Sequence, residues 1–318
     1  MHVLVTGAKG FVGGAVLSRF QKETDVELTA AVRKLPSSID GKASFVAVGN
    51  ISSETDWSQA LQGVDVVVHL AARAHVLNDM QADPLAEFRR VNVEGAVKLL
   101  RQAIDNHVKR FVFISSIGVN GNFTTGEPFS EHSIPAPHAN YALSKLEAEE
   151  ALKALAASSG IELVIVRPPL VYAAHAPGNF ARLLKLIDLG IPLPFACVRN
   201  SRSMVALENL ADFIACCARH PAAAGETFLV CDFEDVSLKE LLELLARGMD
   251  KRLIQLPVPP ALIGWAAGLI GKQNLYTQLC GSLQIDSTKS RQLLAWTPPV
   301  SAQAALIDTG RRFRQSNR

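Results

Sequence analysis

The stretch Val-Leu-Val-Thr-Gly-Ala-Lys-Gly-Phe-Val-Gly at residues 3–13 decides the fold of this 318-residue chain. It starts as an apolar strand and passes through Gly7, Gly10 and Gly13 into a helical pattern. In such a unit the first glycine permits a tight turn, the second lets a pyrophosphate approach the backbone, and the third lets the helix pack closely. The helix N-terminus attracts phosphate groups. The stretch therefore predicts a dinucleotide-binding unit rather than a simple strand–helix turn.

Short β-branched runs alternate with longer helical patterns through the first half of the chain. Runs without polar alternation, such as Phe111 to Ile114, indicate strands that are covered on both faces. The alternation predicts an α/β fold, a Rossmann-type doubly wound parallel sheet. The expected strands are His2–Thr6, Glu27–Val32, Ser44–Val48, Val64–Leu70, Arg110–Ser115 and Glu162–Arg167. The expected helices are Val12–Gln21, Glu54–Gln62, Pro84–Asn106 and Ala139–Ala157.

The pattern changes after Arg167-Pro168-Pro169, where prolines become frequent and helices dominate. We expect an NAD(P)-binding domain over residues 1–168 and a smaller, mostly helical substrate-binding lobe over residues 169–318. A strand at Thr227–Cys231 could rejoin the main sheet. The apolar segment Ala261–Ile270 is too short to span a bilayer. We interpret it as a buried helix, with a peripheral membrane contact as the alternative.

Composition excludes several classes of function. The net charge of +2 gives no electrostatic footprint for nucleic acid. Five cysteines without a Cys-x-x-Cys or Cys/His cluster indicate reduced thiols rather than a metal site or a disulfide framework. The N-terminus enters a strand at once, without the pattern of a signal peptide. We therefore expect a cytoplasmic protein with no metal, no nucleic-acid partner and no transmembrane segment.

Tyr141 and Lys145 are the best candidates for proton transfer. A helix places residues i and i+4 on one face, so phenol and ammonium can point into one pocket. A free tyrosine has a pKa of about 10, and a nearby cation favours the phenolate. The pair therefore suits proton exchange with an alcohol or ketone at neutral pH.

Several residues at strand ends suit a dinucleotide. Arg33 and Lys34 follow the second strand, where an acid commonly binds the ribose hydroxyls of NAD. Because a guanidinium suits a 2′-phosphate, NADP(H) is favoured, with NAD(H) as the alternative. Asn50-Ile51 could face the adenine. Leu70, Ala71 and Ala72 leave room for the cofactor, while His69 is interpreted as structural.

Together these motifs resemble the extended short-chain dehydrogenase/reductase family, the NAD-dependent epimerases and dehydratases. The motifs are Thr6-Gly7-x-x-Gly10-x-x-Gly13, His69-Leu70-Ala71-Ala72, Val91-Asn92-Val93, Ser115-Ser116, Tyr141-x-x-x-Lys145 and Arg167-Pro168-Pro169. The resemblance implies that Tyr141 is the acid/base, that Lys145 holds the nicotinamide ribose, and that Ser116 binds the substrate oxygen. It implies that Asn92 supports the backbone and a proton-relay water. It also implies cofactor contacts from Gly7, Gly10, Phe11, Val12, Arg33, Lys34, Asn50, Ile51, Leu70, Ala71, Ala72, Asn92, Ser115, Tyr141 and Lys145.

Within that family the chain looks like the enzymes of nucleotide sugars. Arg202-Ser203-Met204-Val205 resembles a segment whose arginine binds the diphosphate, which suits a planar fork of donors. Asn179-Phe180 matches a position that contacts the sugar diphosphate. The resemblance also points to Arg73 and His75 as substrate contacts. It implies a homodimer through the helices near residues 84–106 and 139–157.

The motifs narrow the reaction. Dehydratases of this family have Asp-Glu after the serine, whereas this chain has Ile117-Gly118, which argues against 4,6-dehydration. The Arg33–Lys34 pair favours an exchanging cofactor, and hence a 4-keto reductase. The stretch His69 to Val76, with Gly281-Ser282-Leu283-Gln284, also resembles bacterial enzymes that reduce a UDP-4-keto-6-deoxy-N-acetylhexosamine. This resemblance implies NAD(P)H-dependent reduction to UDP-N-acetylquinovosamine or UDP-N-acetylfucosamine in surface-polysaccharide precursor synthesis. The alternatives are a UDP-hexose 4-epimerase with bound NAD and a non-catalytic NADP(H)-sensing protein. Neutral residues such as Tyr276 and Leu279 stand where familiar 4-epimerases carry Arg and Asp.

Overall fold

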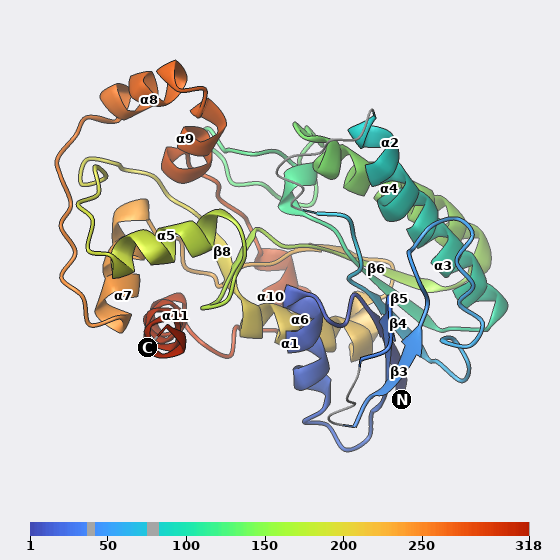
Figure 1. The fold of residues 1–318 in the computed structure, drawn as a ribbon. Helices are drawn as coiled ribbons and strands as arrows, with labels where there is room; N and C mark the ends of the chain where they lie inside the picture. The colour runs from blue at the N-terminus through green and yellow to red at the C-terminus, as the bar shows by residue number, and fades with distance from the viewer. Residues whose placement is uncertain (37–41, 75–82, 318) are drawn as a thin grey trace.

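The computed structural model describes residues 1–36, 42–74 and 83–317, and it centres on one parallel sheet (Figure 1). Seven strands are hydrogen-bonded in the order β3-β2-β1-β4-β5-β6-β9, and every neighbouring pair is parallel. They are β1 (His2–Thr6), β2 (Glu27–Val32), β3 (Ser44–Ala47), β4 (Val66–His69), β5 (Arg110–Ile114), β6 (Glu162–Arg167) and β9 (Thr227–Leu229). The doubly wound sheet is thus confirmed, and β9 joins it beside β6.

The strand order reverses between β1 and β4, which pair in register from Val3 and Val66 to Thr6 and His69. The chain leaves the carboxyl ends of these two strands in opposite directions. In open α/β sheets, ligands bind in the crevice at such a point. The fold therefore positions a site beyond Thr6 and His69.

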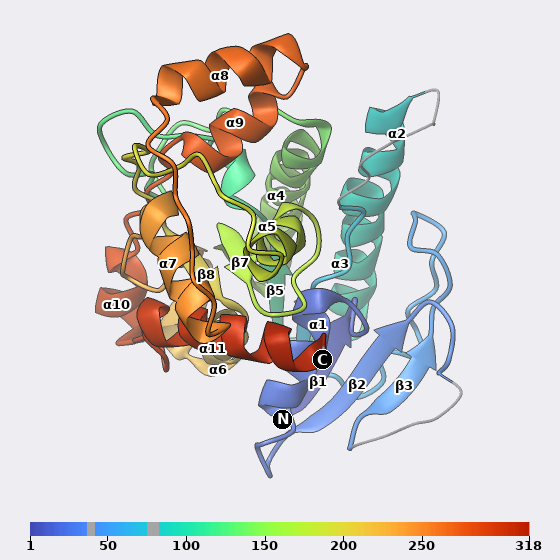
Figure 2. The same ribbon diagram turned by 60° about the vertical axis from the view of Figure 1, so that its left-hand side comes forward.

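Helices cover both faces of the sheet, as Figures 1 and 2 show. Helices α1 (Phe11–Phe20) and α6 (Leu207–Arg219) share one core with Val3 and Val5 of β1. Helices α3 (Gly95–Asp105) and α4 (Asn140–Ser159) share another with Leu4. Successive residues of β1 thus alternate between two apolar layers, which explains its unbroken apolar run.

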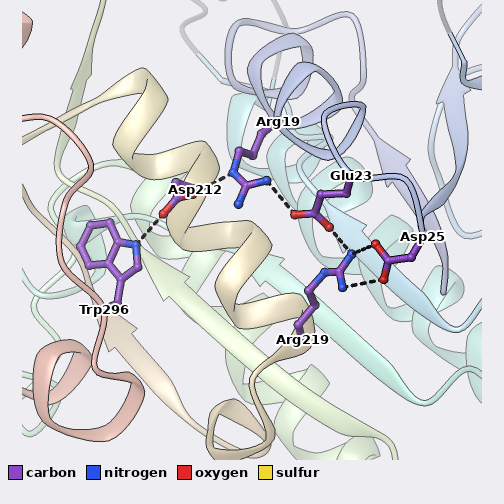
Figure 3. A network of polar contacts seen from close by, with 6 residues as sticks. All are labelled: Arg19, Glu23, Asp25, Asp212, Arg219 and Trp296. Atoms are coloured by element: carbon purple, nitrogen blue, oxygen red, sulfur yellow. Dashed lines mark hydrogen bonds and ion pairs between the residues drawn. The ribbon is translucent and has the colours of Figure 1, made fainter.

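A surface network links α1 to α6 (Figure 3). Arg19 of α1 donates to Asp212 of α6 at 2.8 Å, and Asp212 accepts from Trp296 Nε1 at 3.0 Å. At the other end, Arg219 makes a two-pronged contact with Asp25, at 3.0 and 3.1 Å, and also pairs with Glu23. The network links α1 and α6, the two helices that cover one face of the sheet.

Two expected helices differ in the structure. The pattern over Pro84–Asn106 forms α2 (Pro84–Arg89), a π-helical turn η1 (Arg90–Glu94) and then α3, instead of one helix. The buried side chain of Asn92 lies in the π-helical turn, and such turns are frequent at functional sites.

The helix expected at Glu54–Gln62 is wrong, because this segment consists of turns. Its backbone is held by side chains that compete with helical hydrogen bonds. Gln102 Oε1 accepts from the Trp57 backbone N–H at 2.8 Å, and Asp56 accepts from the Ser58 N–H at 2.9 Å. The buried Trp57 ring fixes the segment against the sheet core.

The C-terminal part adds a second small sheet and a helical layer. Strands β7 (Leu170–Tyr172) and β8 (Met204–Ala206) pair in parallel. A separate apolar core joins them to three helices, which are α5 (Asn179–Asp188), α7 (Leu238–Gly248) and α11 (Ala302–Ser316). The remaining helices are α8 (Pro260–Leu269), α9 (Gln273–Cys280), α10 (Thr288–Leu294) and the short η2 (Ile117–Val119) and η3 (Pro221–Ala223).

Helix α8 corrects the interpretation of Ala261–Ile270 as a buried helix, because no residue of α8 is buried. Leu262, Trp265 and Leu269 are more than half exposed. The helix lies at the outer edge of the molecule in both views (Figures 1 and 2). In the described part of the chain, no helix is long and apolar enough to cross a membrane.

Candidate active site

The glycine turn between β1 and α1 has the geometry that its sequence predicts. Gly7 has φ +64°, a left-handed conformation that favours glycine, and its carbonyl accepts from Gly10 N–H at 2.8 Å. A Cβ added to Gly13 would lie 2.1 Å from the Gly7 carbonyl oxygen. The turn and the first turn of α1 therefore pack without room for a side chain.

A cleft of about 860 Å³ opens beside this turn, at the crevice between β1 and β4. It brings together the predicted cofactor residues Gly7, Gly10, Arg33, Lys34, Asn50, Ile51, Leu70, Ala71 and Ala72, and the predicted substrate residue Arg73. The side chains of Phe11 and Val12 lie elsewhere. The Phe11 ring meets His175 edge-on at 5.1 Å, and Val12 packs on the core. Only the backbone of Phe11 and Val12, at the start of α1, is suited to phosphate contacts.

The cleft fits a dinucleotide. The glycine turn supplies a cradle with no side chains at the helix N-terminus. At the far end, Arg33 and Lys34 are exposed, and neither pairs with a carboxylate among the described residues. The cleft thus combines a backbone anion site with free cations, as phosphate-rich ligands require.

His69 is a structural residue, as the sequence analysis interpreted it. Its Nδ1 is hydrogen-bonded to Thr6 Oγ1 at 2.8 Å, and Thr6 Oγ1 accepts from the N–H groups of Leu70 and Ala71 at 3.2 Å. Burial lowers the pKa of His69 to about 3, so the ring is neutral. Thr6 and His69 together fix the turn that forms the floor of the cleft.

Lys145 lies at the carboxyl end of β5, on the same edge of the sheet. Its Nζ donates to the Ile114 carbonyl at 2.8 Å and lies 4.4 Å from the ring centroid of Phe113. Only 1% of the residue is exposed, and burial lowers its pKa to about 7, opposed by the charge of Glu149. The amine therefore changes its charge state near neutral pH.

Tyr141 is one turn earlier on α4, with its ring 6.3 Å from that of Phe88. Among the described residues its hydroxyl has no hydrogen-bond partner. Burial raises the pKa of Tyr141 to about 12, and Lys145 does not lower it. The expectation that the Lys145 amine favours the phenolate is therefore wrong, because burial raises the pKa of Tyr141 and the amine donates to Ile114. The phenol holds its proton at neutral pH, so it must lose that proton before it can act as a base.

Ser116 begins η2, and its Oγ accepts from the Gly118 N–H at 3.1 Å. A Cβ added to Gly118 would lie 3.3 Å from this oxygen and 3.2 Å from the Ala142 Cβ. Since Ala142 follows Tyr141 on α4, the short helix brings Ser116 beside the start of α4. The predicted serine, tyrosine and lysine thus gather around the ends of β5 and α4.

Asn92 acts on the backbone rather than lining the cleft. Its amide accepts from the Arg73 N–H at 2.8 Å and donates to the Arg73 carbonyl at 3.1 Å. It also donates to Ser144 Oγ at 3.0 Å, which bonds to the Tyr141 carbonyl at 2.8 Å. The π-helical turn thus ties the wall of the cleft to the first turn of α4.

Sequence reasoning missed a buried ion pair beneath this site. Arg167 Nε donates to Glu149 at 2.9 Å, and Arg167 also donates to Asn120 at 3.0 Å. Ser115, predicted as a cofactor contact, donates its hydroxyl to Glu149 at 2.5 Å. The sequence signal that could have identified Glu149 was its spacing, because it follows Lys145 by four residues and lies on the same helix face.

The two predicted diphosphate residues lie beside α9 in the C-terminal part. Arg202 donates to the Gly281 carbonyl at 2.7 Å, and Asn179 donates to Gln278 at 3.1 Å. Burial lowers the pKa of Arg202, and no carboxylate of the described residues compensates its charge. A largely buried, uncompensated guanidinium is suited to an anion. His75, the other predicted sugar contact, lies outside the described residues.

Comparison with known proteins identifies the class. The profile of the NAD dependent epimerase/dehydratase family matches residues 3–231. A UDP-glucose 4-epimerase from Vibrio cholerae is 44% identical over 99% of this chain and 96% of its own length. An N-acetyl-alpha-D-glucosaminyl-diphospho-ditrans,octacis-undecaprenol 4-epimerase from Escherichia coli O157:H7 is 27% identical over 91% of this chain and 88% of its own.

Solved structures agree on the fold. The UDP-glucuronic acid 4-epimerase from Bacillus cereus, in complex with NAD, superposes with a TM-score of 0.79 at 20% identity, over 99% of both chains. The UDP-glucose 4-epimerase from Thermotoga maritima superposes at 0.76 and 21% identity over the full length of both chains. This chain belongs to the NAD-dependent epimerase/dehydratase family. It is an enzyme of the extended short-chain dehydrogenase/reductase type, which confirms the resemblance in its motifs.

Proposed function

We propose that this enzyme is a UDP-hexose 4-epimerase, which oxidises C4 of a UDP-sugar and returns the hydride to the other face. One structural observation carries the chemistry. A phenol, Tyr141, a hydroxyl, Ser116, and an amine, Lys145, whose pKa burial lowers to about 7, lie around the ends of β5 and α4, although none of the three lines the cleft beside the glycine turn. The V. cholerae relative, 44% identical over almost the whole chain, supports the substrate class.

Each residue has a role in this proposal. Ser116 Oγ and the Tyr141 oxygen bind the sugar oxygen that changes oxidation state. In its phenolate form Tyr141 accepts the C4 hydroxyl proton as the hydride leaves C4, and it returns this proton when the hydride is returned. Lys145 provides a positive charge near the nicotinamide ribose when it is protonated. Gly7, Gly10 and the start of α1 hold the pyrophosphate. The nicotinamide, when bound, supplies the hydride chemistry.

Arg202 binds the diphosphate of the substrate, and Asn179, which donates to Gln278 of α9, is a second contact. Its burial and its lack of a carboxylate partner among the described residues support this role. Replacing Arg202 with Ala should raise KM much more than it lowers kcat, because the diphosphate is bound equally in ground and transition states. Replacement with Lys should restore only part of the affinity, since Lys lacks the planar fork.

A second candidate function, the reduction of a UDP-4-keto sugar, is favoured by one observation. Arg33 and Lys34 line the cleft without carboxylate partners in the described part of the chain. This suits the 2′-phosphate of NADP(H), a cofactor that is exchanged after each turnover. An epimerase instead keeps its cofactor through the whole cycle.

The two candidates are separated by assay. Purified enzyme without added cofactor is incubated with UDP-glucose or UDP-N-acetylglucosamine, and the C4 epimers are separated by chromatography. Interconversion supports the epimerase. Inertness together with NADPH-dependent reduction of a UDP-4-keto sugar supports the reductase. Tight binding of the dinucleotide with no turnover of either substrate would favour a sensing protein.

The role of Tyr141 is tested with Tyr141→Phe. This variant should lose most turnover, on the order of a hundredfold or more for a lost acid/base. It should bind the dinucleotide with nearly unchanged affinity. Tyr172→Phe is the control for loss of a phenol hydroxyl, since Tyr172 is buried in the C-terminal core, where its hydroxyl donates to Asp232 at 2.7 Å. Near-normal turnover in Tyr141→Phe would refute the assigned role.

A further inference from the structure

Helix α8 presents an apolar face to solvent instead of to the core. Leu262, Trp265 and Leu269 are exposed by 57, 67 and 68%, and Ile270 at the helix end by 71%. The spacing 262, 265, 269 places these side chains on one side of the helix. The opposite side packs on α9, where a Cβ added to Gly264 would lie 3.2 Å from the Tyr276 ring. A helix that covers a globular core has the opposite orientation, with its apolar face turned towards the core.

The charge around this helix has one sign. Residues 251–285 contain no Asp or Glu, whereas they contain Lys251, Arg252 and Lys272. Lys251 pairs with Asp188 at 3.3 Å. Arg252 follows residues that contact α5 and α11, away from α8. Lys272, directly after α8, is exposed and has no carboxylate partner among the described residues. A short apolar face next to an uncompensated cation, in a stretch without acidic residues, is complementary to a surface that is apolar inside and anionic outside.

We propose that α8, with Leu262, Trp265, Leu269 and Ile270, is a docking surface for an anionic phospholipid bilayer. The helix lies in the plane of the interface with its apolar face in the headgroup region. Trp265 occupies the interfacial zone where tryptophan is enriched. Lys272, at the end of α8, attracts the anionic headgroups electrostatically.

The docking surface continues into the candidate substrate site. Helix α9 follows α8 directly, and its Gln278 accepts from Asn179 at 3.1 Å. The next residues reach Gly281, whose carbonyl accepts from Arg202. A bilayer seated on α8 would therefore lie beside the rim where a sugar diphosphate enters.

Tryptophan fluorescence tests the proposal directly, because Trp265 is the only exposed tryptophan of the three. Trp57 and Trp296 are buried, with exposures of 0 and 5%. The full-length protein is titrated with vesicles of phosphatidylethanolamine and phosphatidylglycerol, and with vesicles of phosphatidylcholine alone. We expect the Trp265 emission to shift to shorter wavelength, and the protein to co-sediment, with the anionic vesicles. High salt should weaken this binding.

Two variants and one control complete the test. Trp265→Ser/Leu269→Ser should lower vesicle partitioning at least about tenfold, since it removes two large apolar side chains. Lys272→Glu should lower it by a similar factor on anionic vesicles only. Leu293→Ser on α10, also an exposed leucine, should bind as the original protein does. Because the replaced side chains are exposed, circular dichroism of all variants should be unchanged.

Three results would overturn the proposal. The first is an unchanged Trp265 emission and no sedimentation with any vesicle. The second is a blue shift that depends on protein concentration without vesicles, which would show that a second copy covers α8. The third is equal vesicle binding by Trp265→Ser/Leu269→Ser and the original protein. None of these measurements uses catalysis, so the outcome is independent of the proposed function.

Discussion

The Nζ of Lys145 and the carbonyl oxygen of Ile114 form a 2.8 Å hydrogen bond that places the amine in an almost dry site. Burial lowers the pKa of this amine to about 7, whereas an unfolded lysine has a pKa of about 10.4. Between these values the unfolded chain holds a proton that the folded chain has released. The free energy of unfolding therefore rises with pH across this window.

Lys145→Met should abolish this pH dependence. We expect the original protein to gain more stability than the variant between pH 7 and pH 9.5, by on the order of 2 kcal/mol. Denaturant unfolding of both proteins at both pH values measures the difference. The other ionisable groups are common to both proteins and cancel, and Tyr141 titrates above this range. Parallel stability curves would contradict a lowered pKa.

The buried pair of Glu149 and Arg167 should matter far more than the surface contact of Arg19 and Asp212. Glu149→Gln leaves the Arg167 charge buried without a counter-ion, so we expect a loss of about 3–5 kcal/mol. Arg19→Ala should cost no more than about 1 kcal/mol, because its side chain is partly exposed. Urea unfolding measures both, and comparable losses would argue against a dry environment for Glu149.

Two adjacent glycines of α1 should respond in opposite ways to alanine. Gly13→Ala places a Cβ 2.1 Å from the Gly7 carbonyl oxygen, so the turn must move and the protein should lose stability and dinucleotide affinity. Gly14→Ala meets nothing within 4 Å and should stabilise the helix by up to about 1 kcal/mol. Thermal unfolding with and without dinucleotide separates them, and equal behaviour would contradict the close packing.

Arg33→Ser/Lys34→Ser should change the choice of cofactor. A charge-assisted contact with a 2′-phosphate is worth about 1.5–3 kcal/mol, so loss of both cations should weaken NADPH binding by at least about tenfold. NADH binding should change little, since it lacks that phosphate. Titration calorimetry with each dinucleotide measures this shift, and an equal loss for both would remove the basis for a preference for NADP(H).

The sheet was predictable because its signals are local. The apolar runs at β1, β5 and β6 predicted their strands from the residues alone. The glycine turn was predictable for the same reason, because residues 3–13 alone provide the glycines that its backbone conformation and close packing require. The helix predicted at Glu54–Gln62 was wrong because this segment depends on a contact that is distant in sequence. Gln102 accepts a hydrogen bond from the Trp57 backbone N–H.

The sequence predicted which residues form the site better than it predicted their pKa values. Spacing placed Tyr141 and Lys145 on one helix, but it could not show that Ile114 holds the amine. The direction of the Tyr141 pKa shift depends on burial, which is a property of the assembled fold. The exposure of α8 was missed for the same reason, because an apolar segment does not reveal whether a core exists to cover it.

The return of the chain to the main sheet limits how the molecule can be divided. A fragment ending near residue 168 would lose α6, which packs on Val16 and Phe20 of α1, and would leave the edge of β6 unpaired. A fragment beginning there would carry α6 and β9 without a sheet to receive them. Each fragment would expose apolar helix surface or an unpaired strand edge. We therefore expect that both parts of the chain must be present for either part to become well ordered.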